Sequence, residues 1–237
     1  MNRDQCKEFK RNPTVNPLTN RKIKINGPTY QLLMNQCQKV CFIFVYGLGC
    51  HTNLPNLAEW QTYYTNISRS EVNVFCDGKV GSILFDSVKQ VCFIPPSIKN
   101  SFVARVYEKI LESVKSHDKV YIGGHSYGGA VVSTIAKHCD RHMDHNVLNK
   151  LEFNTFGSIY IPKDVTNANI KHYMYTNDVA LKCNKLQVKE KVKNVKWLNV
   201  GDKTPVRKFS LFGTKKEWDI HNQYKEYIKE FFLNGKS

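Results

Sequence analysis

The chain lacks several features that would assign it at once to a class of protein. None of its apolar runs approaches the roughly 18 residues that a transmembrane helix requires. Its first 13 residues, MNRDQCKEFKRNP, are charged and contain no apolar core, so they do not resemble a secretory signal peptide. We therefore expect a protein without a transmembrane segment that is made in the cytosol.

The sequence also lacks motifs for metal, cofactor and nucleic-acid binding. The eight cysteines include no CxxC pair, so we expect no structural zinc site, and no motif predicts a metal or a cofactor. Most cysteines after Cys37 lie in apolar segments, where we expect buried, reduced thiols. The chain also has no internal repeat, no nucleic-acid-binding motif and little aromatic interleaving among its basic residues. Nucleic acid is therefore not the partner that we expect.

Acidic residues are scarce in two segments. The formal net charge is +15, and residues 1–38 carry seven Lys or Arg against two acids, a net charge of +5. Residues 182–216 carry eleven against two, a net charge of +9. This pattern suits an anionic surface such as a phospholipid membrane, although a solvated lysine-rich surface would give the same pattern.

What is present is a regular alternation of strands and helices. The length of 237 residues, with 41% hydrophobic and 23% charged residues, suits one sizeable α/β domain with a small appendage. The run Lys39–Gly49 is almost continuously apolar, which is typical of a strand buried on both faces. The pattern predicts further strands at 72–78, 89–96, 119–124, 151–158, 170–179 and 195–202, and helices at 29–37, 99–116, after Gly128 and at 219–233. We therefore predict a mostly parallel sheet with helices on both faces.

The stretch Gly124-His125-Ser126-Tyr127-Gly128 joins one of these strands to a helix. A G-x-S-x-G turn in this context is typical of a nucleophile elbow, in which a serine occupies a sharp, strained turn. Gly124 and Gly128 would leave room for that turn. The backbone N–H of Tyr127 would then point at a developing oxyanion. A glycine-rich turn without catalysis is the alternative.

A nucleophilic serine needs an acid and a base, which follow it along the chain in this fold. Asp178 comes just after an apolar strand, with Asp164 and Asp202 as alternatives. His221 precedes the last predicted helix and is our candidate base. We do not expect the other histidines to serve: His125 cannot easily fold back onto Ser126, His172 opens a strand, and His138, His142 and His145 fall too far along the chain.

These motifs resemble the class 3 (fungal-type) lipases of the α/β-hydrolase superfamily. The matching pieces are GGHSYGGA at 123–130, FNTFGSIYIP at 153–162, YTNDVALKC at 175–183 and DIHNQY at 219–224. The resemblance implies an α/β-hydrolase domain over 39–237 with Ser126 as nucleophile, Asp178 as orienting acid and His221 as general base. It also implies an oxyanion hole formed by the N–H groups of Leu48 and Tyr127.

The first segment resembles a different family, the two-cysteine adaptor domain of large nucleocytoplasmic DNA viruses. Cys6, Phe9, NPTVNPLTNRKI at 12–23, Tyr30 and Cys37 carry the likeness. It implies a module over 1–38, a viral origin, and a location in the host cytoplasm or the virion. Cys6 and Cys37 would be available for a disulfide, which reducing conditions oppose.

Together these observations predict a serine hydrolase that cleaves lipid or other acyl esters through an acyl-enzyme intermediate. The alternative is a catalytically inert viral protein with a hydrolase fold that binds at anionic surfaces, since a fold does not fix a function.

Overall fold

The computed structural model describes residues 1–47, 57–77, 95–181, 194–198 and 223–234. Its centre is a six-stranded sheet in the order β2-β1-β3-β4-β5-β6, in which all five neighbouring pairs are parallel. The strands are β1 (Val40–Val45), β2 (Glu71–Phe75), β3 (Lys119–His125), β4 (Leu151–Phe156), β5 (Ile170–Tyr175) and β6 (Val195–Leu198). The predicted α/β fold class is confirmed.

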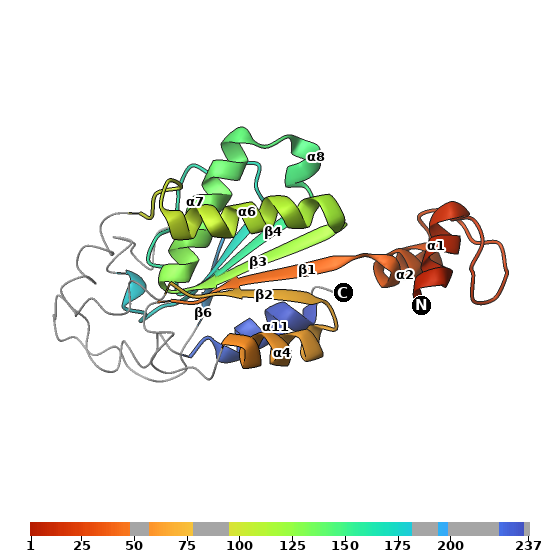
Figure 1. The fold of residues 1–237 in the computed structure, drawn as a ribbon, viewed down its shortest axis with the longest axis horizontal. Helices are drawn as coiled ribbons and strands as arrows, with labels where there is room; N and C mark the ends of the chain where they lie inside the picture. The colour runs from red at the N-terminus through yellow and green to blue at the C-terminus, as the bar shows by residue number, and fades with distance from the viewer. Residues whose placement is uncertain (48–56, 78–94, 182–193, 199–222, 235–237) are drawn as a thin grey trace.

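Helices cover both faces of this sheet (Figure 1). One face carries α6 (Ser101–Ser116) and α7 (Tyr127–His142), followed by the short α8 (His145–Leu148). The opposite face carries α4 (Leu57–Ser68) and α11 (Lys225–Asn234). In the described part of the chain, no helix combines the length and the apolar character that crossing a membrane requires.

Strand β1, which lies between β2 and β3, is apolar throughout because both of its faces are covered. Alternate side chains of a strand point to opposite faces. Cys41, Ile43 and Val45 pack in the mainly aliphatic core below α6 and α7, whereas Phe42 and Phe44 enter the aromatic core below α4 and α11. Because both faces are covered, every residue of β1 is buried.

The structure differs from the predicted elements in a few places. Helix α4 was not predicted, because the side chains that it buries against the sheet are aromatic and polar, as with Tyr64 and Ser68, and lack an aliphatic stripe. Helix α1 (Arg3–Arg11) was also missed, because it is short and polar and buries only Phe9. The predicted strand at 89–96 lies mostly outside the described residues, and so does the start of the helix predicted at 219–233.

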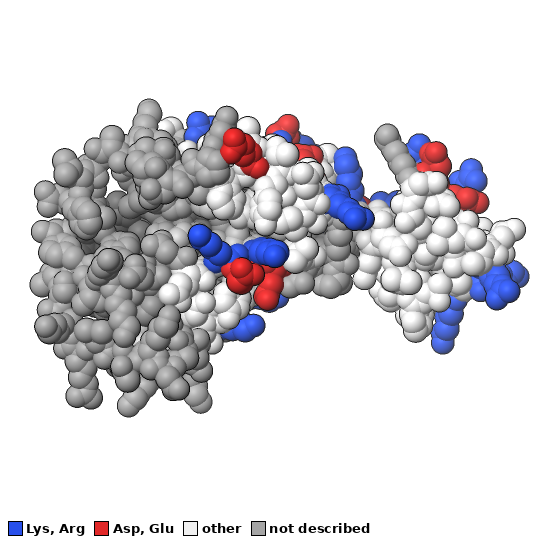
Figure 2. Space-filling view, turned by 90° about the horizontal axis from the view of Figure 1, so that it is seen from below, with Lys and Arg blue, Asp and Glu red and all other residues white. Residues whose placement is uncertain are grey.

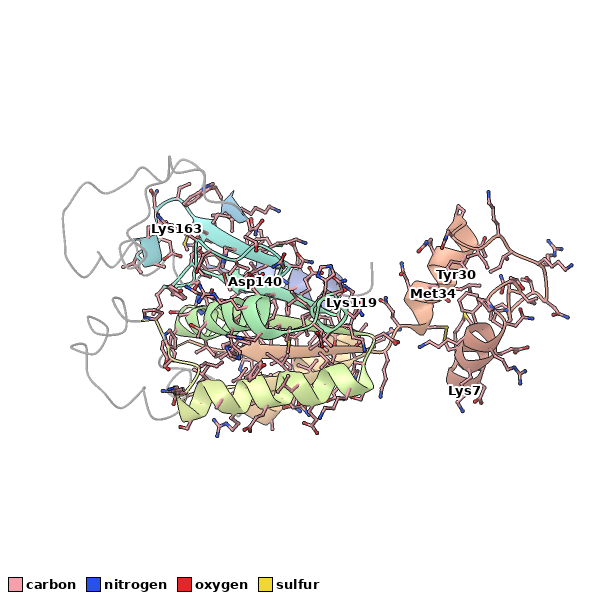
Figure 3. All side chains as sticks on the ribbon, turned by 90° about the horizontal axis from the view of Figure 1, so that it is seen from above. Lys7, Tyr30, Met34, Lys119, Asp140 and Lys163 are labelled. Carbon is pink, nitrogen blue, oxygen red and sulfur yellow. A yellow bond between two sulfur atoms is a disulfide. The ribbon has the colours of Figure 1, made fainter. Side chains whose placement is uncertain are left out.

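The N-terminal residues form a small separate module of α1 and α2 (Pro28–Cys37). A disulfide joins Cys6 to Cys37, with their Cα atoms 5.2 Å apart. Phe9 is completely buried beside Leu33, and the Tyr30 ring meets the Phe9 ring edge-on at 5.7 Å. Figure 3 shows Tyr30 and Met34 in the module, with the sheet at a distance from them.

The module joins the body at the end of the sheet where the strands begin. Asp118 lies at this junction: it accepts the backbone N–H of Lys39 at 2.9 Å and pairs with the Lys10 ammonium at 3.0 Å. Lys119, the first residue of β3, lies toward the module in Figure 3, and Lys163 lies at the other end of the body. The module is therefore attached at the amino ends of the strands.

Two of the remaining cysteines behave as expected. Cys41 and Cys139 are free and buried, and burial raises the pKa of the Cys139 thiol to about 12. Cys76 differs from the expectation, because it is disulfide-bonded in the structure.

Candidate functional site

Ser126 occupies the turn between β3 and α7 at the carboxyl end of the sheet. Its backbone angles are φ 57° and ψ −122°. A positive φ is uncommon for a residue with a side chain, and such conformations persist only where the surroundings impose them. Here the Ser126 N–H donates to the Phe156 carbonyl at 3.0 Å, and the Ser126 carbonyl accepts from Ala130 in the first turn of α7 at 3.2 Å. The turn has the strained geometry of a nucleophile elbow.

The glycines around Ser126 are required by close contacts between backbones. A Cβ on Gly128 would lie 2.0 Å from the Val45 carbonyl oxygen, and a Cβ on Gly124 would lie 2.4 Å from the Gly128 carbonyl oxygen. Neither distance is compatible with a side chain. Helix α7 can therefore start directly against the ends of β1 and β3 only because both positions are glycine.

Gly47, two residues beyond β1, packs directly on the serine. A Cβ at Gly47 would lie 2.7 Å from the Ser126 Cβ and 3.2 Å from the Ser126 Oγ. This close approach brings the segment after β1 to the candidate nucleophile. Leu48, the candidate oxyanion donor, is the next residue in the chain and lies outside the described residues.

Asp178 follows β5 at the same edge of the sheet and is only 2% exposed. Two hydrogen bonds from described residues orient its carboxylate. The Ala180 N–H donates to Oδ1 at 2.7 Å, and the Tyr224 hydroxyl donates to Oδ2 at 2.5 Å. A buried carboxylate with donors on both oxygens is fixed in direction, as the orienting member of a catalytic group must be.

Tyr224 connects Asp178 with the surroundings of the serine turn. Its hydroxyl accepts from the backbone N–H of Tyr175 at 2.9 Å while it donates to Asp178, and its ring centroid lies 5.8 Å from that of His125. Burial and the Asp178 charge hold the Tyr224 pKa well above its ordinary value, so the hydroxyl remains a donor. Tyr224 is the last residue of the DIHNQY motif, but it was assigned no role from the sequence.

Tyr127 and Asp77 also lie at this edge. Tyr127 is 7% exposed, and burial together with the Asp77 charge raises the pKa of its phenol. Asp77 follows β2 and is 9% exposed. Sequence reasoning did not single out Asp77, although its place just after a strand was the available signal.

The structure gives other positions to two residues considered in the sequence. Asp164, an alternative acid, forms ion pairs with Lys137 at 2.9 Å and with Arg141, near the end of α7 remote from Ser126. His172 is 1% exposed in the middle of the sheet, where its Nδ1 lies 2.7 Å from the Thr155 hydroxyl. Burial lowers the pKa of His172 to about 3, which keeps the ring neutral.

His221 and Asp202 lie outside the described residues, so the structure does not relate the candidate base to Ser126 or Asp178. His221 precedes Tyr224 by three residues. The lysine-rich segment 182–216 is also outside the described residues, except for 194–198.

A groove of about 420 Å³ lies between α4 and α11. Aromatic side chains of α4, including Trp60 and Tyr64, form one wall, and Lys225 and Lys229 contribute from α11. Trp60 also contacts the Tyr46 ring at 5.6 Å, and Tyr46 immediately precedes Gly47.

Comparisons with known proteins bear on both parts of the chain. Residues 5–39 match the 2-cysteine adaptor domain, and residues 48–189 match lipase (class 3). Over 33 residues the chain is 54% identical to "Uncharacterized protein 378R" of Invertebrate iridescent virus 6, which covers 14% of this chain and 17% of that protein. The chain thus matches less than a fifth of that relative's length.

A solved structure described as a novel cutinase-like protein from Cryptococcus sp. aligns at 11% identity and a TM-score of 0.45. The alignment covers 83% of this chain and 92% of that chain.

The family match spans more than half of the chain and includes the serine turn, β4, β5 and Asp178. The chain therefore belongs to the lipase (class 3) family and carries a 2-cysteine adaptor domain before its hydrolase domain.

Proposed function

We propose that the protein is a serine esterase that cleaves lipid or other acyl esters through a Ser126–His221–Asp178 triad. The observation that carries the proposal is the positive φ of Ser126 at the junction of β3 and α7, within a family of lipases. A strained serine at a helix N-terminus presents its hydroxyl to a substrate, and the oxyanion that forms from the ester carbonyl lies close to backbone N–H groups.

The roles follow from the chemistry of acyl transfer. His221 takes the proton of the Ser126 hydroxyl as Oγ attacks the ester carbonyl, and it returns that proton to the leaving alcohol. Water then hydrolyses the acyl-enzyme with the same base. Asp178 orients the imidazole and stabilises its charged form. In support, Tyr224 contacts Asp178, and His221 lies three residues earlier, a stretch that spans at most about 11 Å.

The oxyanion hole is formed in this proposal by the N–H groups of Tyr127 and Leu48. Tyr127 is the first residue of α7, where backbone N–H groups lack partners within the helix. The close packing of Gly47 on Ser126 supports the role of Leu48, its neighbour.

A fluorophosphonate probe tests the assignment of the nucleophile, because it reacts covalently with activated serines. We expect labelling of the wild-type protein and none of Ser126→Ala. Ser133→Ala is the matched control, since Ser133 lies on the same helix and its buried hydroxyl has no hydrogen-bond partner among the described residues. It should label like the wild type. Equal labelling of both variants would refute the role of Ser126.

The same assay separates this function from an inert hydrolase fold. An inert protein would neither be labelled nor turn over short p-nitrophenyl esters, whereas the proposed enzyme does both and loses both in Ser126→Ala. Asp178→Asn should lower kcat by about 10⁴, the effect of removing the orienting carboxylate in other serine triads.

We further propose that the basic N-terminal module holds the protein at an anionic lipid surface. Figure 2 shows Lys and Arg side chains around the edge of the module, with fewer Asp and Glu side chains among them, whereas the described part of the body carries both signs side by side. Vesicles containing phosphatidylserine should bind the protein at low salt and release it at high salt. Binding that persists at high salt, or equal binding to neutral vesicles, would contradict this attachment. The relative from an iridescent virus supports a viral origin, and with it a place in the host cytoplasm or the virion.

A further inference from the structure

Three side chains that can bind a metal meet at the amino ends of the strands, far along the sheet from the serine turn. Cys41 lies on β1, Glu71 on β2 and His117 directly after α6. One ligand atom from each lies within 4.8 Å of the other two. From these residues we infer that Cys41, Glu71 and His117 form a binding site for a divalent zinc-like ion.

The backbone holds two of the three donors side by side. Cys41 and Glu71 are direct partners in the parallel register of β1 and β2. Cys41 packs below α6, and that helix ends at Ser116, which delivers His117 over the same face. The site is therefore formed by three elements whose positions the fold already fixes.

The hydrogen bonds of His117 prepare its other nitrogen for a cation. Its Nδ1 lies 2.9 Å from the Ser116 hydroxyl, which can donate or accept, and 3.1 Å from the Ser113 carbonyl, which can only accept. In the tautomer that carries its hydrogen on Nδ1, this hydrogen is donated to Ser113, and the Nε2 lone pair faces Glu71 Oε2 at 3.3 Å. A metal ion between Nε2 and Oε2 would select this tautomer. An Nδ1–H donated to a backbone carbonyl is the usual support of a metal-binding histidine.

A hydrogen bond also orients the Glu71 carboxylate. The Asn73 amide donates to Oε1 at 3.1 Å, which leaves Oε2 toward His117, and the same amide lies 3.6 Å from the Cys41 sulfur. Lys109 lies 3.7 Å from Oε1 and opposes a cation, but it also pairs with Glu112 at 3.1 Å. The charge of Lys109 is thus shared between two carboxylates.

The donor set selects the class of metal. Sulfur, imidazole and carboxylate together suit zinc, whose tetrahedral sites place ligand atoms about 3.3 to 3.7 Å apart. The Glu71–His117 distance already lies in this range, and the Cys41 sulfur needs to move by less than about 1.5 Å. On binding, the Cys41 thiol releases its proton to solvent, the thiolate and carboxylate charges balance the ion, and water takes the fourth position.

Cobalt(II) is the probe for this site, because it replaces zinc and gives a thiolate-to-cobalt charge-transfer band. The full-length chain, stripped of metal with a chelator, should show this band and saturate at one equivalent of Co²⁺. Zn²⁺ should abolish the band by displacement. Cys41→Ser should lose the band altogether, and a band that survives in this variant would overturn the proposal.

Glu71→Gln and Glu112→Gln form a matched pair of variants. Both carboxylates contact Lys109, both are partly exposed, and only Glu71 faces His117 and Cys41. We expect Glu71→Gln to weaken Co²⁺ binding at least tenfold and Glu112→Gln to leave it unchanged. Equal affinities in the two variants, or no band in the wild type, would show that His117 and Glu71 form only a direct side-chain contact without a metal ion.

A second imidazole pair needs its own control. His138 and His142 lie one turn apart on α7 with ring centroids 4.5 Å from each other, and they too can hold a metal ion. The variant His142→Asn removes this pair without touching a thiol. The charge-transfer band should persist in it at the wild-type affinity, and loss of the band there would count against the Cys41 site.

Discussion

The Tyr224 hydroxyl donates to the Asp178 carboxylate at 2.5 Å and so ties the start of the last helix to the end of β5. The same hydroxyl accepts the Tyr175 N–H, so its loss would leave two buried polar groups without this partner. We predict that Tyr224→Phe lowers the free energy of unfolding by about 1 to 3 kcal/mol, because buried groups that lose a hydrogen bond keep their desolvation cost.

The same variant should reduce esterase turnover less than Asp178→Asn, since the Asp178 carboxylate remains. Denaturant unfolding and kcat measured on a p-nitrophenyl ester check the two effects. Tyr227→Phe is the control on the same helix and should change neither quantity appreciably. An unchanged unfolding free energy in Tyr224→Phe would show that the hydrogen bonds of the Tyr224 hydroxyl make no net contribution to stability.

Gly47→Ala tests the contact between the segment after β1 and the serine. The new Cβ would lie 2.7 Å from the Ser126 Cβ, closer than real side chains approach. We expect probe labelling and turnover to fall at least about tenfold, because a shift of around 1 Å at a reacting group can cost about 10² in rate. Gly27→Ala, in the module, is the control. Activity of Gly47→Ala at the wild-type level would mean that this segment moves away without consequence.

The buried His172 should make stability depend on pH. Its pKa is lowered to about 3 in the folded protein from an ordinary 6.5, so the unfolded chain binds a proton first as the pH falls. Stability from this residue is therefore present above pH 6.5 and is lost progressively toward pH 3. The wild type minus His172→Gln difference in unfolding free energy should shrink by about 2 kcal/mol between pH 7.5 and pH 5.

Denaturant titrations at the two pH values measure that difference. His145→Gln is the control, because His145 is exposed, and its difference from the wild type should be the same at both pH values. A constant difference for His172→Gln as well would contradict the neutral, buried state of the ring.

Asp140, labelled on α7 in Figure 3, holds the loop before β5 through backbone contacts. Its Oδ1 accepts the N–H groups of Asn167 and Ala168 at 2.6 Å each, and Thr166 donates at 3.3 Å. We predict that Asp140→Ala lowers the unfolding free energy by about 1 to 3 kcal/mol, since several N–H groups lose their acceptor.

Asp164→Ala is the comparison, because Asp164 makes only partly exposed ion pairs in this region and such pairs contribute about 1 kcal/mol or less. Thermal unfolding of both variants measures the contrast. A larger loss in Asp164→Ala than in Asp140→Ala would reverse our ranking of the two carboxylates.

The sequence predicted those parts of the structure that depend on local pattern. The apolar run of β1 indicates a strand that is buried on both faces. The glycines around Ser126 indicate a turn that has no room for side chains. The contact of Tyr224 with Asp178 joins residues 46 positions apart. Its only signal in the sequence was the position of Tyr224 after His221 in a family motif.

The cluster of Cys41, Glu71 and His117 could not be predicted from the sequence. The absence of a CxxC pair argued against zinc, since metal motifs in sequences are recognised by short spacings. Strand register and the end of a helix bring these three residues together instead. Such a set becomes visible only when the sheet order is known, because no two of its members are neighbours in the chain.

The attachment of the small module has a geometric consequence. The module joins the amino end of β1, whereas Gly47 and Ser126 lie beyond the carboxyl ends of β1 and β3, about 20 Å away along a six-residue strand. A partner that binds the N-terminal module therefore contacts the protein at the end of the sheet opposite the Ser126 turn, and it can bind without covering that turn.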